Sequence, residues 1–238
     1  MKRLCTICAR GGSKGYKNKN IKNLLGKPLI AHSIIQAKSS ELFDCIAVSS
    51  DSNKILDIAK KWGADLLIKR PPKLAEDDAP KLPSIKHCVI EAEKKSKQVF
   101  DTIADLDSTS PLRIFKDIYG AIKLLEEKGI SNVVTAAPAF RSPYYNLLEL
   151  SVNGFARKSK LLKSSILRRQ QSPKCYDANA SVYVWKRDAL FEKFSETSII
   201  EDTMLYIMPV ERSRDIDGPL DFEIVEFLMK RKSENYNY

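Results

Sequence analysis

Short apolar runs alternate along the chain with segments in which apolar residues recur every three to four positions. The runs are typical of strands, and the periodic segments are typical of amphipathic helices. Strands are predicted at residues 4–9, 45–49, 65–68, 102–106 and 132–136. Helices are predicted between them, at residues 29–38, 54–62, 82–95 and 115–128. Because the strands are almost continuously apolar and helices separate them, the pattern predicts a mostly parallel sheet covered on both faces.

Right-handed crossovers between such strands lead to an α/β fold, a doubly wound three-layer sandwich formed by residues 1–238 as a single domain. The rhythm changes after Pro138. Residues 144–150 and 152–155 are predicted to form a hairpin around the Asn-Gly turn at 153–154. Residues 140–175 are therefore expected to leave the sheet as an excursion. Strands at 180–185 and 205–210 and a helix at 221–230 are predicted to complete the fold.

Composition is that of a soluble globular protein, with 43% hydrophobic residues. No apolar run approaches the roughly 20 residues that span a bilayer, and the first run is too short for a signal peptide. We therefore expect a cytoplasmic protein without a membrane partner. The five cysteines are an odd number and do not form a disulfide framework. Cys5 and Cys8 point to opposite faces of a strand, so they are not expected to share a metal.

The net charge of +10 is unevenly distributed. The first forty residues hold nine lysines and arginines and no carboxylate, and residues 157–174 form a second acid-free basic stretch. Such surfaces suit a polyanion, whether a nucleoside triphosphate, an acidic sugar or a nucleic acid, although a solvated basic face has the same composition. Nucleic-acid binding is the weaker interpretation, because the cations cluster at a glycine turn and no aromatic residues are interleaved with them.

The glycine turn follows the first predicted strand, where ligands of open α/β sheets bind. Gly11, Gly12 and Gly15 allow close approach of the backbone to a phosphate, and Arg10 and Lys14 add cationic donors. The spacing matches neither a Walker A loop nor a dinucleotide fingerprint. The residues alone therefore indicate a polyphosphate cradle, with a tight solvent-exposed turn as the alternative.

Five motifs in order resemble those of the CMP-acylneuraminate synthetase family of cytidylyltransferases. The matching segments are Ala9-Arg10-Gly11-Gly12-Ser13-Lys14-Gly15 with Lys19-Asn20, Leu74-Ala75-Glu76-Asp77-Asp78-Ala79, Ser108-Thr109-Ser110-Pro111-Leu112-Arg113, Arg169-Gln170-Gln171 with Asn179-Ala180-Ser181-Val182-Tyr183, and Asp215-Ile216-Asp217 with Leu220-Asp221. The resemblance covers almost the whole chain and implies a nucleotide-diphospho-sugar transferase-like fold.

The resemblance implies a reaction in which the anomeric hydroxyl of a nine-carbon 2-keto acid sugar attacks the α-phosphate of CTP and pyrophosphate leaves. It implies catalytic roles for Arg10, Lys14 and Asp217. The implied nucleotide-binding residues are Arg10, Gly12, Ser13, Lys14, Lys19, Asn20 and Arg70. Asp215 and Asp217 are two apart, so on an extended segment their carboxylates face the same side and suit a Mg²⁺ cofactor. By the residues alone a solvated turn is the alternative, and the resemblance favours the metal.

For the sugar, the resemblance implies contacts from Asp107, Thr109, Ser110, Arg169, Gln170, Asp177 and Asn179. Sialic acid enzymes commonly have a glutamine at the place of Asp107 and an arginine at that of Asp177. An ionised carboxylate accepts hydrogen bonds and cannot donate them, which favours donors on the sugar such as an acetamido N–H. These departures resemble the CMP-legionaminic acid synthetases, so N,N'-diacetyllegionaminic acid is the expected substrate, with N-acetylneuraminic acid and pseudaminic acid as alternatives.

The family places a dimerisation arm at residues 140–175, and a lone hairpin does not bury both of its faces. A homodimer with Arg169 near a shared site is therefore expected, and a flap that folds back on its own subunit is the alternative. An inactive nucleotide-binding homologue is a further alternative. Retention of Arg10, Lys14, Asp215 and Asp217 argues against it.

Overall fold

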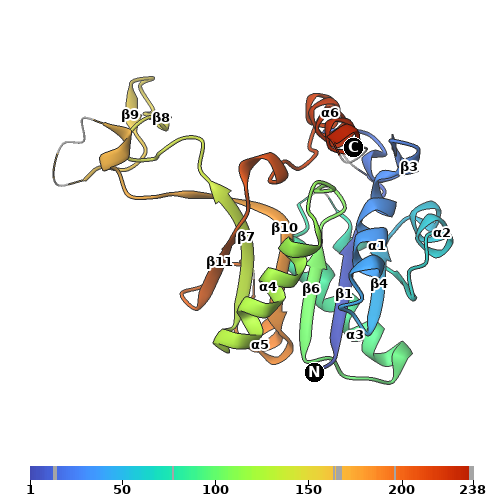
Figure 1. The fold of residues 1–238 in the computed structure, drawn as a ribbon. Helices are drawn as coiled ribbons and strands as arrows, with labels where there is room; N and C mark the ends of the chain where they lie inside the picture. Colours follow the sequence, from blue (N-terminus) through green and yellow to red (C-terminus); the bar gives the residue numbers. More distant parts are fainter. Residues whose placement is uncertain (13–14, 77, 163, 165–167, 196, 236–238) are drawn as a thin grey trace.

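A seven-stranded sheet forms the centre of the protein in the computed structural model, which describes residues 1–12, 15–76, 78–162, 164, 168–195 and 197–235 (Figure 1). Its strand order is β11-β7-β10-β6-β1-β4-β5. The strands are β1 (Arg3–Cys8), β4 (Cys45–Ser50), β5 (Leu66–Lys69), β6 (Thr102–Leu106), β7 (Asn132–Pro138), β10 (Tyr176–Lys186) and β11 (Thr203–Ile207). Each neighbouring pair is parallel except where β10 lies antiparallel between β6 and β7.

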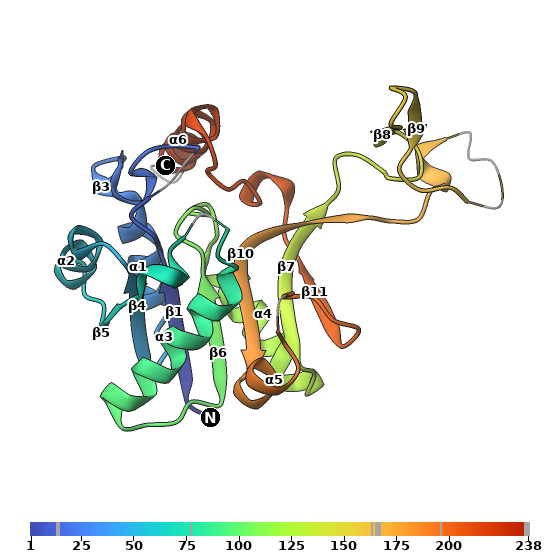
Figure 2. The same cartoon turned by 180° about the vertical axis from the view of Figure 1, so that it is seen from behind.

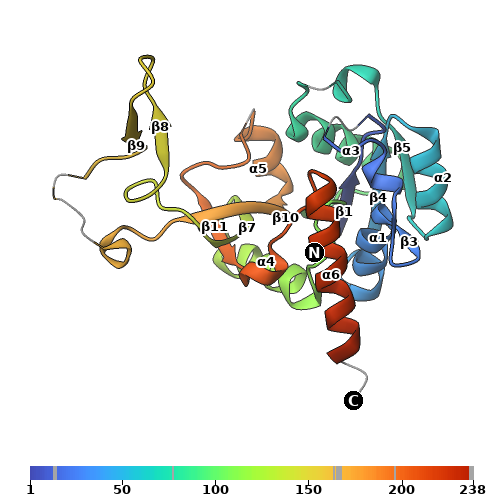
Figure 3. The ribbon, with the colours of Figure 1, turned by 90° about the horizontal axis from the view of Figure 1, so that it is seen from above.

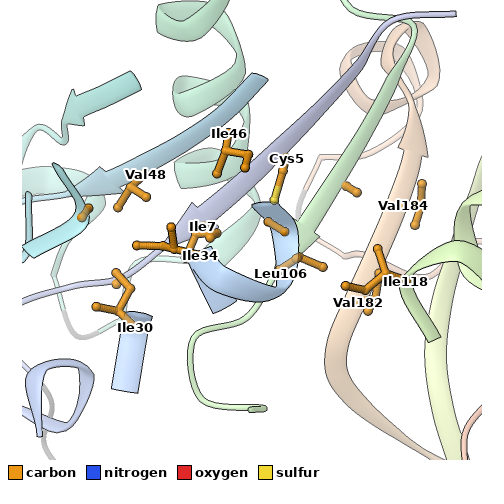
Figure 4. Close-up of a cluster of buried hydrophobic side chains, with 14 of the residues drawn as sticks. Cys5, Ile7, Ile30, Ile34, Ile46, Val48, Leu106, Ile118, Val182 and Val184 are labelled. Carbon is orange, nitrogen blue, oxygen red and sulfur yellow. The ribbon is translucent and has the colours of Figure 1, made fainter. Parts of the chain in front are cut away.

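Helices cover both faces of the sheet, as the alternation predicts. On one face lie α1 (Leu29–Ser40), α2 (Asn53–Lys61) and α4 (Phe115–Lys128), and on the other lie α3 (Lys81–Ser96) and α5 (Arg187–Glu192) (Figure 2). Figure 4 shows the core on the α1 face of the sheet, which includes Ile30 and Ile34 of α1 and Ile7 and Ile46 of the strands. Two buried faces explain why the strands read as nearly continuous apolar runs.

The two N-terminal cysteines lie on opposite faces of β1, as predicted. Cys5 belongs to the core beneath α1, whereas Cys8 packs against the core beneath α3. In the part of the chain that the structure describes, no three metal-ligating side chains gather into a cluster. Likewise, none of its helices combines the length and the apolar character needed to cross a membrane.

The long antiparallel strand β10 is interrupted by a bulge. Its pairing with β7 shifts register between Ala178 and Tyr183. Ala180 within the bulge has φ 50°, in the left-handed region that residues other than glycine rarely adopt. Bulges bend and twist a strand. The bulge therefore separates the half of β10 that lies between β6 and β7 from the half that leads out of the body of the protein.

Residues 139–175 form an arm that extends from the ends of β7 and β10 away from the sheet (Figure 3). This confirms that the segment leaves the sheet. The arm carries the hairpin of β8 (Leu148–Leu150) and β9 (Ala156–Lys158) and one turn of 3₁₀ helix, Arg169–Gln171. The hairpin around the Asn-Gly turn is confirmed, with its second strand beginning at Ala156. Gly154 N–H bonds to the Ser151 carbonyl at 2.9 Å and Gly154 has φ 78°, so Val152, Asn153 and Gly154 form a three-residue loop.

Most other boundaries lie close to their predicted positions, and two elements coincide with them, at Thr102–Leu106 and Phe115–Lys128. Strand β10 begins at Tyr176, before the predicted strand 180–185. The predicted strand at 205–210 begins and ends earlier, at Thr203–Ile207, and the last helix, α6 (Pro219–Asn235), is longer than predicted. A small hairpin, β2 (Asn23–Leu24) with β3 (Lys27–Pro28), and three further 3₁₀ turns at Lys19–Ile21, Pro72–Leu74 and Val210–Arg212 complete the described elements.

Candidate functional site

A pocket of about 410 Å³ opens at the carboxyl ends of the parallel strands. Its wall comes from four segments that are distant in sequence: the loop after β1, the segment from Arg70 to the first turn of α3, the loop after β6, and Asp217 before α6. The lining residues are Cys8, Arg10, Gly15, Lys19, Asn20, Arg70, Leu74, Glu76, Ala79, Lys81, Ser84, Asp107, Ser108, Thr109 and Asp217. Most of the residues predicted to bind the nucleotide or a metal therefore meet here.

The glycine loop is held against two neighbouring segments. Gly11 N–H donates to Asp51 Oδ1 at 2.8 Å, and Arg10 Nη1 donates to the Glu76 carbonyl at 3.0 Å. A Cβ on Gly15 would lie 2.7 Å from the carbonyl oxygen of Asp217, so no other residue fits there without moving the chain. The loop thus packs directly on the predicted metal segment. Ser13 and Lys14 lie outside the described residues, and their predicted phosphate contacts stay predictions.

Asn20 ties the loop after β1 to the loop after β6. Its side-chain Nδ2 donates to the Arg10 carbonyl at 3.0 Å, and its Oδ1 accepts from Ser108 Oγ at 2.8 Å. Since Asn20 is buried, these bonds fix the relative positions of the two loops. Gly12 has open space around the position of a Cβ. Its predicted nucleotide contact remains untested.

The aspartates of the 215–217 segment flank a buried apolar anchor, Ile216. Ile216 N–H donates to the Thr109 carbonyl at 2.9 Å, and Lys19 Nζ lies 2.5 Å from the Ile216 carbonyl and 3.1 Å from Asp217 Oδ1. Burial and the nearby Asp217 charge raise the pKa of Asp215 above its usual value. A half-buried carboxylate beside a second carboxylate offers oxygen ligands to a divalent cation, and the cation would stabilise the negative charge of both.

Arg70 is a buried residue in this pocket and does not extend from the surface. Its Nε and Nη2 donate to Ser49 Oγ at 3.2 Å and to the Ser49 carbonyl at 3.0 Å. These bonds fix the guanidinium beside the ends of β4 and β5. Arg10, Lys19, Arg70 and Lys81 thus bring four cationic side chains to one pocket.

Asp107 is the predicted sugar residue with the densest set of contacts. Its Oδ1 accepts from Thr109 N–H at 3.0 Å and from Thr109 Oγ1 at 2.9 Å, and its Oδ2 accepts from Lys81 Nζ at 2.7 Å. Burial opposes the charged form, but the Lys81 charge and these hydrogen bonds prevail and lower the pKa of Asp107 to about 2. The same ammonium lies 2.8 Å from the fully buried Asp105.

Two of the predicted sugar residues are buried behind the pocket. Ser110 Oγ lies 3.5 Å from the Asn179 carbonyl. The Asn179 amide accepts from Thr135 Oγ1 at 2.6 Å and donates to Ser213 Oγ at 2.9 Å, so it joins the bulge of β10 to the segment that leads to Asp215. Neither residue lines the pocket, and their contacts with a sugar stay predictions.

The remaining sugar predictions lie on the arm or at its base. Arg169 and Gln170 line a second cavity of about 630 Å³ within the arm, and Arg169 Nη2 donates to the Ala139 carbonyl at 2.7 Å. Asp177 Oδ2 accepts from Phe140 N–H at 3.1 Å. Within one subunit the structure therefore separates the predicted sugar residues into two groups.

Sequence reasoning missed several residues of the pocket. Lys81, Ser84 and Glu76 line it, and Asp221 Oδ2 accepts from Asp217 N–H at 3.2 Å and Gly218 N–H at 2.9 Å. A signal for Lys81 was present: it directly precedes the predicted helix 82–95 and lies two positions after the motif that ends at Ala79. A residue at that position begins a helix whose N-terminus meets the carboxyl edge of the sheet.

The chain is similar to known proteins over its whole length. A protein-family model described as "Cytidylyltransferase" matches residues 4–217. A CMP-N,N'-diacetyllegionaminic acid synthase of Campylobacter jejuni is 46% identical over 97% of this chain and 96% of its own length. A pseudaminic acid cytidylyltransferase of the same species is 34% identical over 99% of each chain.

Among solved structures, a CMP:2-keto-3-deoxy-manno-octonic acid synthetase complexed with CTP superimposes with a TM-score of 0.70. The match covers 98% of this chain and 100% of that structure at 16% identity, so the likeness shows the shared fold alone. The family match over most of the chain, together with the relatives of 46% and 34% identity, establishes the family. The protein belongs to the cytidylyltransferase family.

Proposed function

We propose that the protein transfers CMP from CTP to the anomeric hydroxyl of a nine-carbon 2-keto acid sugar, with N,N'-diacetyllegionaminic acid as the substrate. The observation that carries the proposal is the meeting of Arg10, Lys19 and Arg70 with Asp217 and Asp107 in one pocket. The cationic side chains suit a triphosphate. Of the two carboxylates, Asp217 suits a metal ion and Asp107 suits a hydrogen-bond donor on the sugar. A volume of about 410 Å³ is in the range of small-molecule sites.

In the transfer, a bond forms between the sugar oxygen and the α-phosphorus, and the bond from that phosphorus to the bridging oxygen breaks. Pyrophosphate carries away the electron pair, and the hydroxyl proton passes to solvent or to a carboxylate of the pocket. Negative charge grows on the transferring phosphate and on the leaving group. Arg10 and Lys19 are preorganised by bonds to the Glu76 and Ile216 carbonyls, so they stabilise that charge without reorganising.

Asp215 and Asp217 would hold a Mg²⁺. Their carboxylates flank buried Ile216, and burial together with the nearby Asp217 charge raises the pKa of Asp215. A bound Mg²⁺ supplies Lewis-acid stabilisation of phosphate charge. The ion pair between Lys19 Nζ and Asp217 Oδ1, at 3.1 Å, limits how far that carboxylate turns.

The choice of sugar rests on Asp107 and Asp177. Both are acceptors where sialic acid enzymes commonly have donors, which favours a sugar with N–H donors. The higher identity to the legionaminic acid relative than to the pseudaminic acid relative, 46% against 34%, supports the same choice.

The proposal includes a homodimer formed through the arm. Apolar side chains of the hairpin are solvent-exposed, among them Leu148, Leu150, Val152 and Phe155. Large exposed apolar patches typically mark association surfaces. A partner that covers the arm would also bring Arg169 and its cavity toward a pocket. The free thiols, of which Cys5, Cys45 and Cys88 are buried, fit a reducing, cytoplasmic location.

The experiment is a sugar panel with CTP and Mg²⁺, with pyrophosphate release as the readout. N,N'-Diacetyllegionaminic acid is expected to give the highest kcat/KM. A tenfold preference for N-acetylneuraminic acid, about 1.4 kcal/mol, would refute the sugar assignment, and absence of pyrophosphate release with every sugar would refute the reaction. Sedimentation of the wild type is expected to give twice the 26.9 kDa monomer mass, and Leu150→Asp is expected to shift it toward the monomer.

A further inference from the structure

Lys81 stands between two carboxylates at the wall of the pocket. It is the first residue of α3, and its Nζ lies 2.8 Å from Asp105 Oδ2 and 2.7 Å from Asp107 Oδ2. The Asp105 side chain is fully buried, that of Asp107 is 17% exposed, and that of Lys81 is 33% exposed. The ammonium therefore places one positive charge within ion-pair distance of two carboxylates that are largely withdrawn from bulk water.

The hydrogen bonds of Asp107 leave little freedom to its carboxylate. An ionised carboxylate has about four acceptor positions. Thr109 N–H and Thr109 Oγ1 use two on Oδ1, and Lys81 Nζ uses one on Oδ2. One acceptor position on Oδ2 remains for a ligand in the pocket that Asp107 lines.

We propose that Lys81 is a positioning residue for sugar selectivity: by bridging Asp105 and Asp107 it keeps Asp107 an oriented, acceptor-only group that requires a hydrogen-bond donor on the sugar. The inference rests on the proposed function and deepens it. Without the ammonium, one proton is expected to be shared by the two carboxylates, as in other close carboxylate pairs. A protonated Asp107 would present a donor at the position where the native pocket presents an acceptor.

The surrounding charges do not replace Lys81. Tyr183 of β10 faces the ammonium at 5.5 Å from its ring, and burial raises its pKa, so it stays neutral near pH 7. Arg113 donates to the backbone carbonyl of Asp107 at 2.8 Å and not to its carboxylate. Asp215 adds further negative potential. Among the residues that the structure describes, removal of Lys81 therefore leaves the two carboxylates without a cation bonded to either.

The test compares Lys81→Met, the charge-conserving Lys81→Arg and, as a matched control on the same helix, Lys94→Met, whose side chain is 66% exposed. In Lys81→Met, the KM for the sugar is expected to rise by about tenfold near pH 6, with the KM for CTP changed by less than about twofold. An acid limb should appear between pH 5 and 7, and Lys81→Arg should lack it. Both histidines remain in every variant, so a limb specific to Lys81→Met does not come from imidazole.

A readout independent of turnover separates this inference from the proposed reaction. Carbon-13 NMR of the aspartate carboxyls is expected to show one carboxyl that titrates above pH 5 in Lys81→Met and none at that position in the wild type. Adding Asp107→Asn to Lys81→Met should abolish that titration. A Lys81→Met protein that folds and shows neither the titration nor the acid limb overturns the proposal, as does an effect confined to the KM for CTP. If no sugar is turned over, the proposed function is refuted. The NMR titration of the aspartate carboxyl still tests whether Lys81 bridges Asp105 and Asp107.

Discussion

The guanidinium of Arg212 and the carboxylate of Asp117 form a two-pronged ion pair, with Nε to Oδ2 at 2.9 Å and Nη2 to Oδ1 at 2.8 Å. Asp117 is fully buried in the first turn of α4, and its Oδ2 also accepts from Ile114 N–H at 3.0 Å. Arg212 ends the 3₁₀ turn three residues before Asp215. The pair therefore anchors the predicted metal segment to a helix of the central sandwich.

Asp117→Asn is expected to lower the free energy of unfolding by about 3 kcal/mol, because it leaves Arg212 without its charged partner in a largely buried site. Urea denaturation measures the change. The matched control is Glu127→Gln on the same helix, where the pair with Lys123 spans 3.6 Å and is exposed, and where the expected change is below about 0.5 kcal/mol. Equal changes in the free energy of unfolding for the two substitutions would contradict a stabilising role for the buried pair.

Gly15→Ala should impair catalysis and leave the fold intact. The added Cβ would meet the Asp217 carbonyl oxygen at 2.7 Å and push the glycine loop away from the metal segment. We expect kcat to fall by about a hundredfold at an unchanged melting temperature, since small misplacements of reacting groups have effects of that size. In Gly218→Ala the Cβ would lie 3.8 Å from Asp221 Oδ2, an ordinary contact, so near-normal turnover is expected.

Gly120→Ala is expected to destabilise the protein although alanine is the better helix former. The new Cβ would overlap a ring carbon of Tyr206 on β11. Overpacking of this kind costs about 1–3 kcal/mol, which outweighs the roughly 0.5–1 kcal/mol that alanine gains within a helix. Thermal unfolding of Gly120→Ala, Tyr206→Ala and the double variant measures the coupling, and simple additivity would refute the clash.

The Asp107 carboxylate is expected to contribute to stability with a defined dependence on pH. Its pKa is lowered from 3.8 to about 2 in the folded protein, so the contribution is fully present above pH 4 and disappears as pH falls toward 2. The shift corresponds to about 2 kcal/mol. Urea titrations of the wild type and Asp107→Asn should therefore differ at pH 5–7 and converge toward pH 2. A difference that persists at the lowest pH would exclude this origin.

Asp217→Ala is expected to preserve the fold and to abolish nearly all activity at every Mg²⁺ concentration. The side chain of Asp217 is 79% exposed, so its removal leaves the packing of Ile216 unchanged. Circular dichroism controls for folding, and pyrophosphate release at increasing Mg²⁺ measures the loss. Near-normal turnover at saturating Mg²⁺ would remove Asp217 from the proposed metal site.

Sequence reasoning located most elements because local signals mark them. Helix α4 has the predicted ends: Asp117 caps its first turn, and Gly129, with φ 68°, ends it in the left-handed conformation. Strand β10 was the harder case. It begins at Tyr176, four residues before the predicted strand. Asp177 and Ala178 are extended because they pair with β7, which is separated from them in sequence by the whole arm.

The site was predictable only in part, for a similar reason. Motifs next to strand ends placed Arg10, Asn20 and Asp107 in one pocket. The bridge from Lys81 to Asp107 joins residues 26 positions apart, and the bond of Asn179 to Ser213 joins residues 34 apart. Nothing in the local pattern reports such contacts. Within one subunit, Arg169 and Gln170 on the arm lie apart from the pocket. The order of the motifs along the chain does not reveal this separation.

The place of β10 in the sheet constrains the order in which this protein takes shape during synthesis. The sheet neighbours of β7 are β10 and β11, both of which follow it in the chain. When β7 leaves the ribosome, it has no strand to pair with until the whole arm has been made. The N-terminal strands β1, β4, β5 and β6 already pair with one another by then. Chain growth thus exposes an unpaired apolar strand while residues 139–175 are translated, and this interval is where the nascent chain is most open to aggregation.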